Sequence, residues 1–288
     1  MRRILFRAFF AAVLLVSAHV HAQPAAVVEG VQMPAWIERG GQRQPIVPGM
    51  LLQRGDVLHT GAGSRLLIRM SERSLVKLGE NGHLRFTELA PSKELFRAAL
   101  GVLEGAFRFT TAIAAKNRRR DVSISVGNVT AGIRGTDLWG RSRDNTEIVC
   151  LIEGAIEVGA QGEAPVTMDQ PRQFYRRVGG QTQPVGFVEP EQLTQWAQET
   201  EIQAGRGAAR RGGKWNVNLL SAENQSAVLD VYDQVRAAGY GAEIFPTKAG
   251  EKRVYVVRIR SLPSQAEARA LAGQLRGRYG VTEPTVGG

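Results

Sequence analysis

The sequence predicts two folded regions of different class, a mainly β region over residues 27–188 and an α+β region over residues 214–288. In the first region, short apolar alternations are separated by glycine-rich turns, which is typical of an all-β domain built from many short strands. In the second, strand-like alternations are interleaved with two segments of helical period. A region of either length can bury a core of its own.

Within the β region, an apolar period of two residues marks the expected strands. Asp56 follows Gly55 where the chain should turn, and we expect its carboxylate to bond the local backbone. Cys150 has apolar neighbours on both sides, so we expect a buried, inert thiol. We expect strands at residues 66–70, 75–78, 84–87, 106–110, 122–126, 147–152 and 155–158, and a short helical turn over residues 92–100.

The α+β region has the predicted order β-α-β-β-α-β, in which two helices cover one face of a four-stranded antiparallel sheet. The first helix should end at Gly239, and the second begins with a capping box formed by Ser264 and Glu267. The apolar stripes of these helices are residues 228, 231, 232 and 235 and residues 268, 271, 272 and 275. Strands are expected at residues 215–220, 241–245, 253–260 and 281–286.

The other face of this sheet is left open. Alternation places polar amides, guanidinium groups and one aromatic ring on it, which is a suitable surface for an extended polar polymer. The residues expected on the open face are Asn216, Asn218, Glu243, Phe245, Val256, Arg258 and Arg260.

Four segments of this region, in this order, resemble the SPOR domain: Trp215-Asn-Val-Asn218, Ala238-Gly-Tyr240, Tyr255-Val-Val-Arg-Ile259 and Pro263-Ser-Gln-Ala-Glu-Ala268. The resemblance covers about 70 residues, a plausible size for a small domain. SPOR domains bind glycan strands of bacterial peptidoglycan that have lost their stem peptides. The family usually has Gln where Asn218 stands and Gly-Pro where Arg260 and Ser261 stand.

The resemblance implies a glycan-binding site on the open face. A muramic acid residue without its peptide exposes a lactyl carboxylate, with which two arginines can pair. Residue types alone allow another interpretation, in which these arginines are only a solvated strand face. The same fold also serves RNA recognition through stacked aromatic rings, but this face offers one such ring, so we expect no nucleic-acid partner. The implied site residues are Asn216, Asn218, Phe245, Val256, Arg258 and Arg260.

Residues 1–22 have the three-part form of a secretory signal peptide, with arginines, an apolar run and a small-residue cleavage site before Gln23. The apolar run is too short to span a membrane comfortably, and an uncleaved anchor is the alternative. We therefore expect a periplasmic protein with no membrane anchor after processing. The formal charge of +10 falls to +7 without the three signal-peptide arginines and still favours anionic envelope polymers.

Few residues offer catalytic or metal chemistry. Cys150 is the only cysteine, and after processing His59 and His83 are the remaining histidines. Glu153 and Glu157 would lie about 13 Å apart along one strand, too far for either glycosidase geometry. We therefore expect no enzyme activity, no metal site and no cofactor.

Three segments of the β region resemble the FecR domain: Leu52-x-x-Gly-Asp-Val-Leu-x-Thr60, Gly132-Ile-Arg-Gly-Thr136 and Ile152-Glu-Gly-Ala-Ile-Glu-Val158. With the residues around them they cover about 150 residues, a typical domain size. In transmembrane members this domain is the periplasmic arm of a signalling protein. Here the resemblance implies a domain that binds another envelope protein or a ligand.

Two short segments join the regions. Residues 189–202 have helical spacing, and we expect Trp196 to pin this short helix onto the β region. Residues 203–213, rich in Gly, Ala and Arg, predict a flexible basic linker. The whole chain is then interpreted as an exported, non-catalytic envelope protein that binds peptidoglycan glycan strands, at the division site if the SPOR resemblance extends to location. The alternative is periplasmic signalling or sensing through the FecR-like domain, with the SPOR-like domain as a tether.

Overall fold

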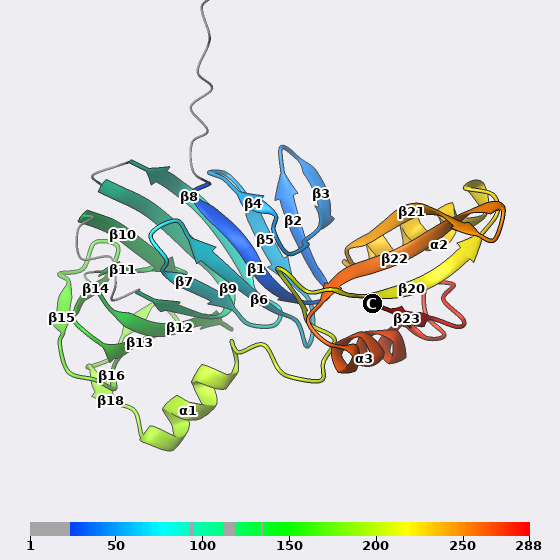
Figure 1. Cartoon of the computed structure of the whole chain (residues 1–288). Helices are drawn as coiled ribbons and strands as arrows, with labels where there is room; N and C mark the ends of the chain where they lie inside the picture. Colours follow the sequence, from blue (N-terminus) through cyan, green and yellow to red (C-terminus); the bar gives the residue numbers. More distant parts are fainter. Residues whose placement is uncertain (1–23, 93–94, 112–118, 134) are drawn as a thin grey trace, which may run out of the picture.

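The computed structural model describes residues 24–288 except residues 93–94, 112–118 and 134. The predicted signal peptide, residues 1–22, and Arg134 therefore lie outside the described residues. The N-terminal β region and the C-terminal α+β region lie side by side (Figure 1). The predicted fold class is confirmed for both regions.

The N-terminal region consists of strands joined by short connections. In chain order they are β1 (Ala26–Gln32), β2 (Ala35–Arg39), β3 (Gln42–Pro45), β4 (Leu51–Leu52), β5 (Val57–Thr60), β6 (Arg65–Met70), β7 (Leu75–Leu78), β8 (His83–Pro91), β9 (Leu95–Thr110), β10 (Arg119–Val126), β11 (Val129–Ile133), β12 (Asp137–Arg143), β13 (Thr146–Glu153), β14 (Ile156–Ala160), β15 (Val166–Met168), β16 (Gln173–Val178), β17 (Gln181–Thr182) and β18 (Gly186–Phe187). Each predicted strand overlaps one of these. The helical turn expected over residues 92–100 is wrong, because Phe96, Ala98 and Leu100 alternate into the core as part of β9.

These strands form two sheets that share β9. Residues 95–104 of β9 pair with β8 and β10 in one sheet, and residues 105–110 pair with β7 and β12 in the other. Gly105 stands at the change of sheet with a φ of 86°, and a Cβ there would lie 2.6 Å from Cα of Gly82. Only glycine fits this corner, where the chain passes from one sheet to the other.

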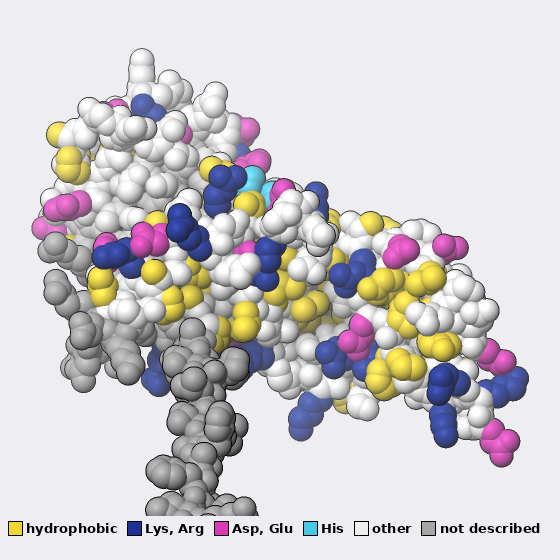
Figure 2. Space-filling model, turned by 90° about the horizontal axis from the view of Figure 1, so that it is seen from above, with side chains coloured by type: hydrophobic (Ala, Val, Ile, Leu, Met, Phe, Trp, Pro, Cys, Tyr) yellow, Lys and Arg dark blue, Asp and Glu magenta, His cyan; other side chains and the backbone are white. Residues whose placement is uncertain are grey.

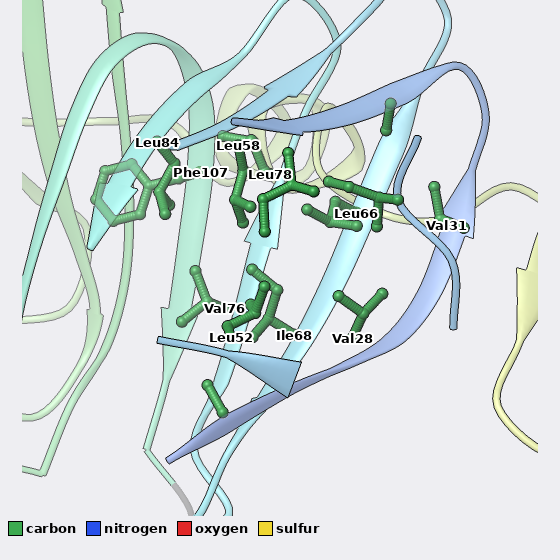
Figure 3. Close-up of a cluster of buried hydrophobic side chains, with 14 of the residues drawn as sticks. Val28, Val31, Leu52, Leu58, Leu66, Ile68, Val76, Leu78, Leu84 and Phe107 are labelled. Carbon is green, nitrogen blue, oxygen red and sulfur yellow. The ribbon is translucent and has the colours of Figure 1, made fainter. Parts of the chain in front are cut away.

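The main core lies between the two sheets (Figure 3). Val28, Ile68 and Leu78 come from one sheet, Leu58 and Leu84 come from the other, and all five are fully buried. Burying one such side chain contributes ~1.5–3 kcal/mol. The β region therefore has a large apolar core of its own, as in other two-sheet packings.

Helix α1 (Pro190–Gln198) packs on this region through aromatic rings. Trp196 stacks on Trp139 of β12, with ring centroids 4.7 Å apart and planes 10° apart. Phe174 of β16 meets the same indole edge-on at 6.2 Å. The predicted role of Trp196, pinning the helix onto the β region, is confirmed.

The C-terminal region has the predicted order of helices and strands. They are β20 (Trp215–Ala222), α2 (Ser226–Ala237), β21 (Ala242–Ala249), β22 (Lys252–Leu262), α3 (Gln265–Leu275) and β23 (Thr285–Gly287). The sheet order is β21-β22-β20-β23, and every neighbouring pair is antiparallel. Both helices pack on one face of this sheet with the stripes expected of them, which are Val228, Val231 and Val235 in α2 and Ala268, Leu271, Ala272 and Leu275 in α3.

Residues 203–213 do not form the flexible linker that their composition predicts. Strand β19 (Ala209–Arg210) pairs with β1 of the N-terminal region, and Ala208 and Ala209 are buried. A Cβ at Gly207 would lie 2.9 Å from Cα of Leu271. The prediction is wrong because the small residues that are typical of flexible linkers here allow the backbone to pack closely against α3.

The carboxylate of Glu267 holds this segment in place. It accepts hydrogen bonds from the backbone N–H groups of Gly205, Gly207 and Ala208 at 2.6, 2.7 and 3.1 Å. Ser264 caps α3 as expected, accepting from the backbone N–H of Glu267 at 3.2 Å. The other half of the predicted capping box is therefore replaced by a contact that joins the two regions.

Two more hydrogen bonds connect the regions directly. The backbone N–H of Ala35 donates to the carbonyl of Gly239 at 3.1 Å, and the indole N–H of Trp36 donates to the carbonyl of Ala237 at 3.1 Å. Both acceptors lie at the end of α2. The C-terminal sheet is therefore held in one orientation relative to the β region.

Candidate functional site

The pairing of the C-terminal strands places the predicted open-face residues in rows. Asn218 of β20 lies opposite Arg258 of β22, which lies opposite Glu243 of β21. In the next row, Val256 lies opposite Phe245. Residues directly opposite in antiparallel strands point to the same face, which is here the face away from the helices.

Arg258 is the centre of this arrangement. Its Nε donates to Oε1 of Glu243 at 2.8 Å, and its Cζ lies 3.5 Å from the centroid of the Phe245 ring. A guanidinium over an aromatic face is attracted by the ring quadrupole. The side chain is 18% exposed, so both contacts hold Arg258 in one position on the sheet.

Arg260 completes a cluster of three charges. Its Nε lies 3.0 Å from the same Oε1 of Glu243, while its side chain is 60% exposed. Both arginines contact the carboxylate through Nε, and each guanidinium carries further N–H donors. Two arginines and one glutamate leave a net charge of +1, which suits a ligand with a single carboxylate.

A β-bulge explains the direction of Arg260. Trp215 lies opposite Leu262 and Val217 opposite Ile259, so β22 carries one residue more than β20 over this stretch. Ser261, inside the bulge, has a φ of 68°. Bulges re-aim side chains, and a left-handed residue at such a position is usually glycine.

The remaining predicted site residues contribute unequally. Val256 is 9% exposed and offers little area to a ligand, whereas Phe245 is 39% exposed. Asn218 is half-buried within the row of Arg258. Asn216 lies opposite Gly287 of β23 on one side and opposite the bulge that contains Arg260 and Ser261 on the other.

Three further polar residues belong to the face but were not among the predicted site residues. Glu243 was expected on the face and is the shared partner of both arginines. Ser221 lies opposite Val256, and Thr285 lies opposite Asn218. A second irregularity, at Leu219 of β20, reverses the alternation before Ser221, and a period of two residues cannot reveal it.

In the N-terminal region, the motifs singled out in the sequence have structural roles. Asp56 is fully buried, binds Arg39 through both carboxylate oxygens at 2.7 Å and accepts from the backbone N–H of Gln53 at 2.8 Å. Burial raises the pKa of the Cys150 thiol to about 12, which keeps it protonated and inert as expected. Glu153 ends β13 and Glu157 lies in β14, so the single strand expected to carry both is wrong.

Charged side chains of both signs are interspersed on the face of the molecule seen in Figure 2. Hydrophobic side chains gather between them on the C-terminal region, to the right of that view. None of the helices in the described part of the chain is long and apolar enough to cross a membrane.

Comparison with known proteins finds both expected domains in the chain. The family model described as FecR protein matches residues 56–157, and the model described as SPOR domain matches residues 212–283. The chain therefore contains a FecR domain and a SPOR domain. Both are non-catalytic, envelope-associated families, and the SPOR domain is a peptidoglycan-binding domain. No curated protein matches the chain.

Among solved structures, the chain is similar to two crystal structures of a proposed anti-sigma factor from Parabacteroides distasonis. The sequence identities are 11% and 13%, and the TM-score is 0.40 in both cases. The matches cover 80% and 76% of this chain and 98% and 89% of the other chains.

Proposed function

We propose that this protein is an exported, non-catalytic envelope protein that binds peptidoglycan glycan strands through the open face of its SPOR domain. The observation that carries the proposal is the cluster of Arg258, Arg260, Glu243 and Phe245 on that face. In this role the FecR domain presents a surface to another envelope protein, in the periplasm and at the division site.

The chemistry of the cluster suits a glycan strand without stem peptides. Each muramic acid residue of such a strand carries a lactyl carboxylate, and charge-assisted hydrogen bonds to arginine are the strong ones. The exposed ring of Phe245 offers an apolar surface to a sugar face. A strand that keeps its peptides has no free lactyl carboxylate, so the same cluster discriminates against it.

Co-sedimentation of the full chain with purified sacculi, before and after amidase removal of the stem peptides, tests this function. We expect binding to rise after stripping and to fall at least roughly tenfold in the double variant Arg258→Ala, Arg260→Ala. The double variant Arg85→Ala, Arg176→Ala is the matched control, because it removes the same charge from exposed positions of the FecR domain. Equal loss in both variants, or no binding of the unaltered chain, contradicts the proposal.

The FecR match supports a second candidate function, periplasmic signalling or sensing through the β region with the SPOR domain as a tether. The two functions predict different consequences in the cell when Arg258 and Arg260 are removed. Transcript profiling of cells that carry the Arg258→Ala, Arg260→Ala chain in place of the original distinguishes them. A transcriptional response that persists while the protein leaves the glycan supports signalling, and an unchanged transcriptome on complete deletion of the gene excludes it.

A further inference from the structure

The junction between the two domains contains a partly open cavity of about 210 Å³. Its apolar wall comes from the FecR side and includes Met33, Ile46 and Val47. Its polar wall comes from the SPOR side and includes Arg236 and Arg260. Neither domain forms this cavity alone, and domain junctions are common places for ligand sites.

The cavity continues from the open face of the SPOR sheet. Glu243 and Arg260 line it and also belong to the charge cluster on that face. The contacts of Ala35 and Trp36 with the end of α2, and the pairing of β19 with β1, fix the two walls relative to each other. The cavity is therefore preformed, which lowers the cost of ordering a ligand in it.

The end of β22 contributes Arg260 and Ser261 to the lining of the cavity. Ser261 holds a φ of 68°, a conformation that costs free energy for a residue with a side chain. Such backbone strain is often kept where it positions a ligand-binding group, here Arg260.

We propose that this cavity is an additional subsite for the next sugar residue of the glycan strand bound on the open face. Its volume equals that of roughly seven water molecules, which is room for one sugar residue. Arg236 can donate hydrogen bonds to the hydroxyl and acetamido oxygens of that residue, while Ile46 and Val47 contact its acetamido methyl group or ring face. The proposal rests on the proposed function, and it makes the FecR domain part of the glycan site.

Two variants of the full chain test the subsite. Val47→Trp fills the cavity from the FecR side and leaves the charge cluster untouched. Arg236→Met removes the second positive charge but keeps an apolar contact with Tyr232, over which Arg236 lies. Val166→Trp is the matched control, since Val166 is exposed on β15 and distant in the sheet order from the junction.

The probe is a series of peptide-free glycan oligomers fractionated by length, with dissociation constants measured by calorimetry. For the unaltered chain we expect a step in affinity of roughly tenfold at the length that reaches the cavity. Both test variants should lose this step while binding shorter oligomers as before, and Val166→Trp should keep it. A step that persists in Arg236→Met overturns the subsite even if Val47→Trp fails to fold. If no protein shows a step in affinity with oligomer length, the subsite is overturned. If Arg258→Ala also loses all binding in that case, glycan binding by the open face is still supported.

Discussion

The two domains use their arginines in opposite ways. In the N-terminal β region, Arg39 binds Asp56 and Arg108 binds Asp137, each through two hydrogen bonds, and Arg108 also lies 3.4 Å from Glu201. The hydrogen bond to the carboxylate raises the pKa of both arginines. On the SPOR face, two arginines share one oxygen of Glu243, and Arg260 is 60% exposed.

This difference separates stabilising charges from charges that can bind a ligand. A buried carboxylate that accepts from Nε and Nη2 of one arginine keeps that edge of the guanidinium from other ligands, and its loss is a loss of folding free energy. A shared, half-exposed carboxylate leaves donors and net positive charge at the surface. Substitutions of the buried pairs should therefore change the free energy of unfolding, and substitutions in the cluster on the SPOR face should change glycan affinity.

The largest effect is expected for Asp56→Ala. The change leaves Nε of Arg39 and the backbone N–H of Gln53 without the fully buried Asp56 carboxylate as acceptor, while Nη2 of Arg39 keeps the Leu51 carbonyl. We expect a loss of about 3 kcal/mol in the free energy of unfolding, at the low end for a broken buried pair because Arg39 is one third exposed. Urea unfolding measures this loss, and binding to stripped sacculi should be unchanged at temperatures where the variant is folded. A variant with unchanged stability and weak glycan binding would show that Asp56 supports binding and not folding.

The next effect concerns the contact that joins the domains. Glu267→Ala removes three hydrogen bonds from the backbone of residues 205–208. Hydrogen bonds to charged groups contribute ~1.5–3 kcal/mol each before relaxation, so we expect a net loss of about 2 kcal/mol. Amide hydrogen exchange should become faster in residues 203–211, with Glu251→Ala, an exposed turn residue, as control. Unchanged exchange there would show that the pairing of β19 with β1, and not Glu267, holds the segment.

A smaller effect, a gain in affinity rather than a loss of stability, is expected for a substitution in the charge cluster of the SPOR face. Glu243→Gln raises the net charge of the cluster from +1 to +2 while keeping an acceptor for the two Nε atoms. We expect the affinity for stripped glycan to rise roughly two- to fivefold at low salt and the gain to shrink at high salt. Salt-dependent calorimetry checks both. If affinity falls instead, Glu243 acts mainly by orienting the arginines.

Local periodicity predicted most of the fold. It failed where the structure of a segment depends on contacts with residues far away in the sequence. The apolar stripes of α2 and α3 and the alternation in the strands can be read from the sequence, because each helix or strand buries one of its faces. The passage of β9 between two sheets is not visible locally, since it depends on the approach of Gly82 to Gly105. The ordered segment 203–213 was missed for the same reason, because its partners lie in β1 and α3.

The candidate site was predicted in part. Asn218, Phe245, Val256 and Arg258 lie on the open face as the alternation predicts. The bulge at Ser261 and the irregularity at Leu219 change which neighbouring residues point to the open face, and a period of two residues carries no information about them. The family departure at residues 260–261 was the available signal that this end of β22 is unusual.

The smallest effect is expected from His83 of the FecR domain, which tests whether that domain also responds to proton concentration. Burial, with the nearby His59 second, lowers the pKa of His83 below its ordinary value of 6.5. The unfolded chain therefore binds a proton more readily than the folded one, and the native state loses stability as the pH falls from about 6.5 through the lowered pKa. Arg85 acts in the same direction, and Glu104 and Glu38 oppose it.

We expect a lower urea midpoint at mildly acidic than at neutral pH, and a smaller difference in His83→Gln. Glycan binding by the SPOR face should keep the same affinity in both proteins. An equal pH dependence in the two proteins would assign the acid sensitivity to other groups.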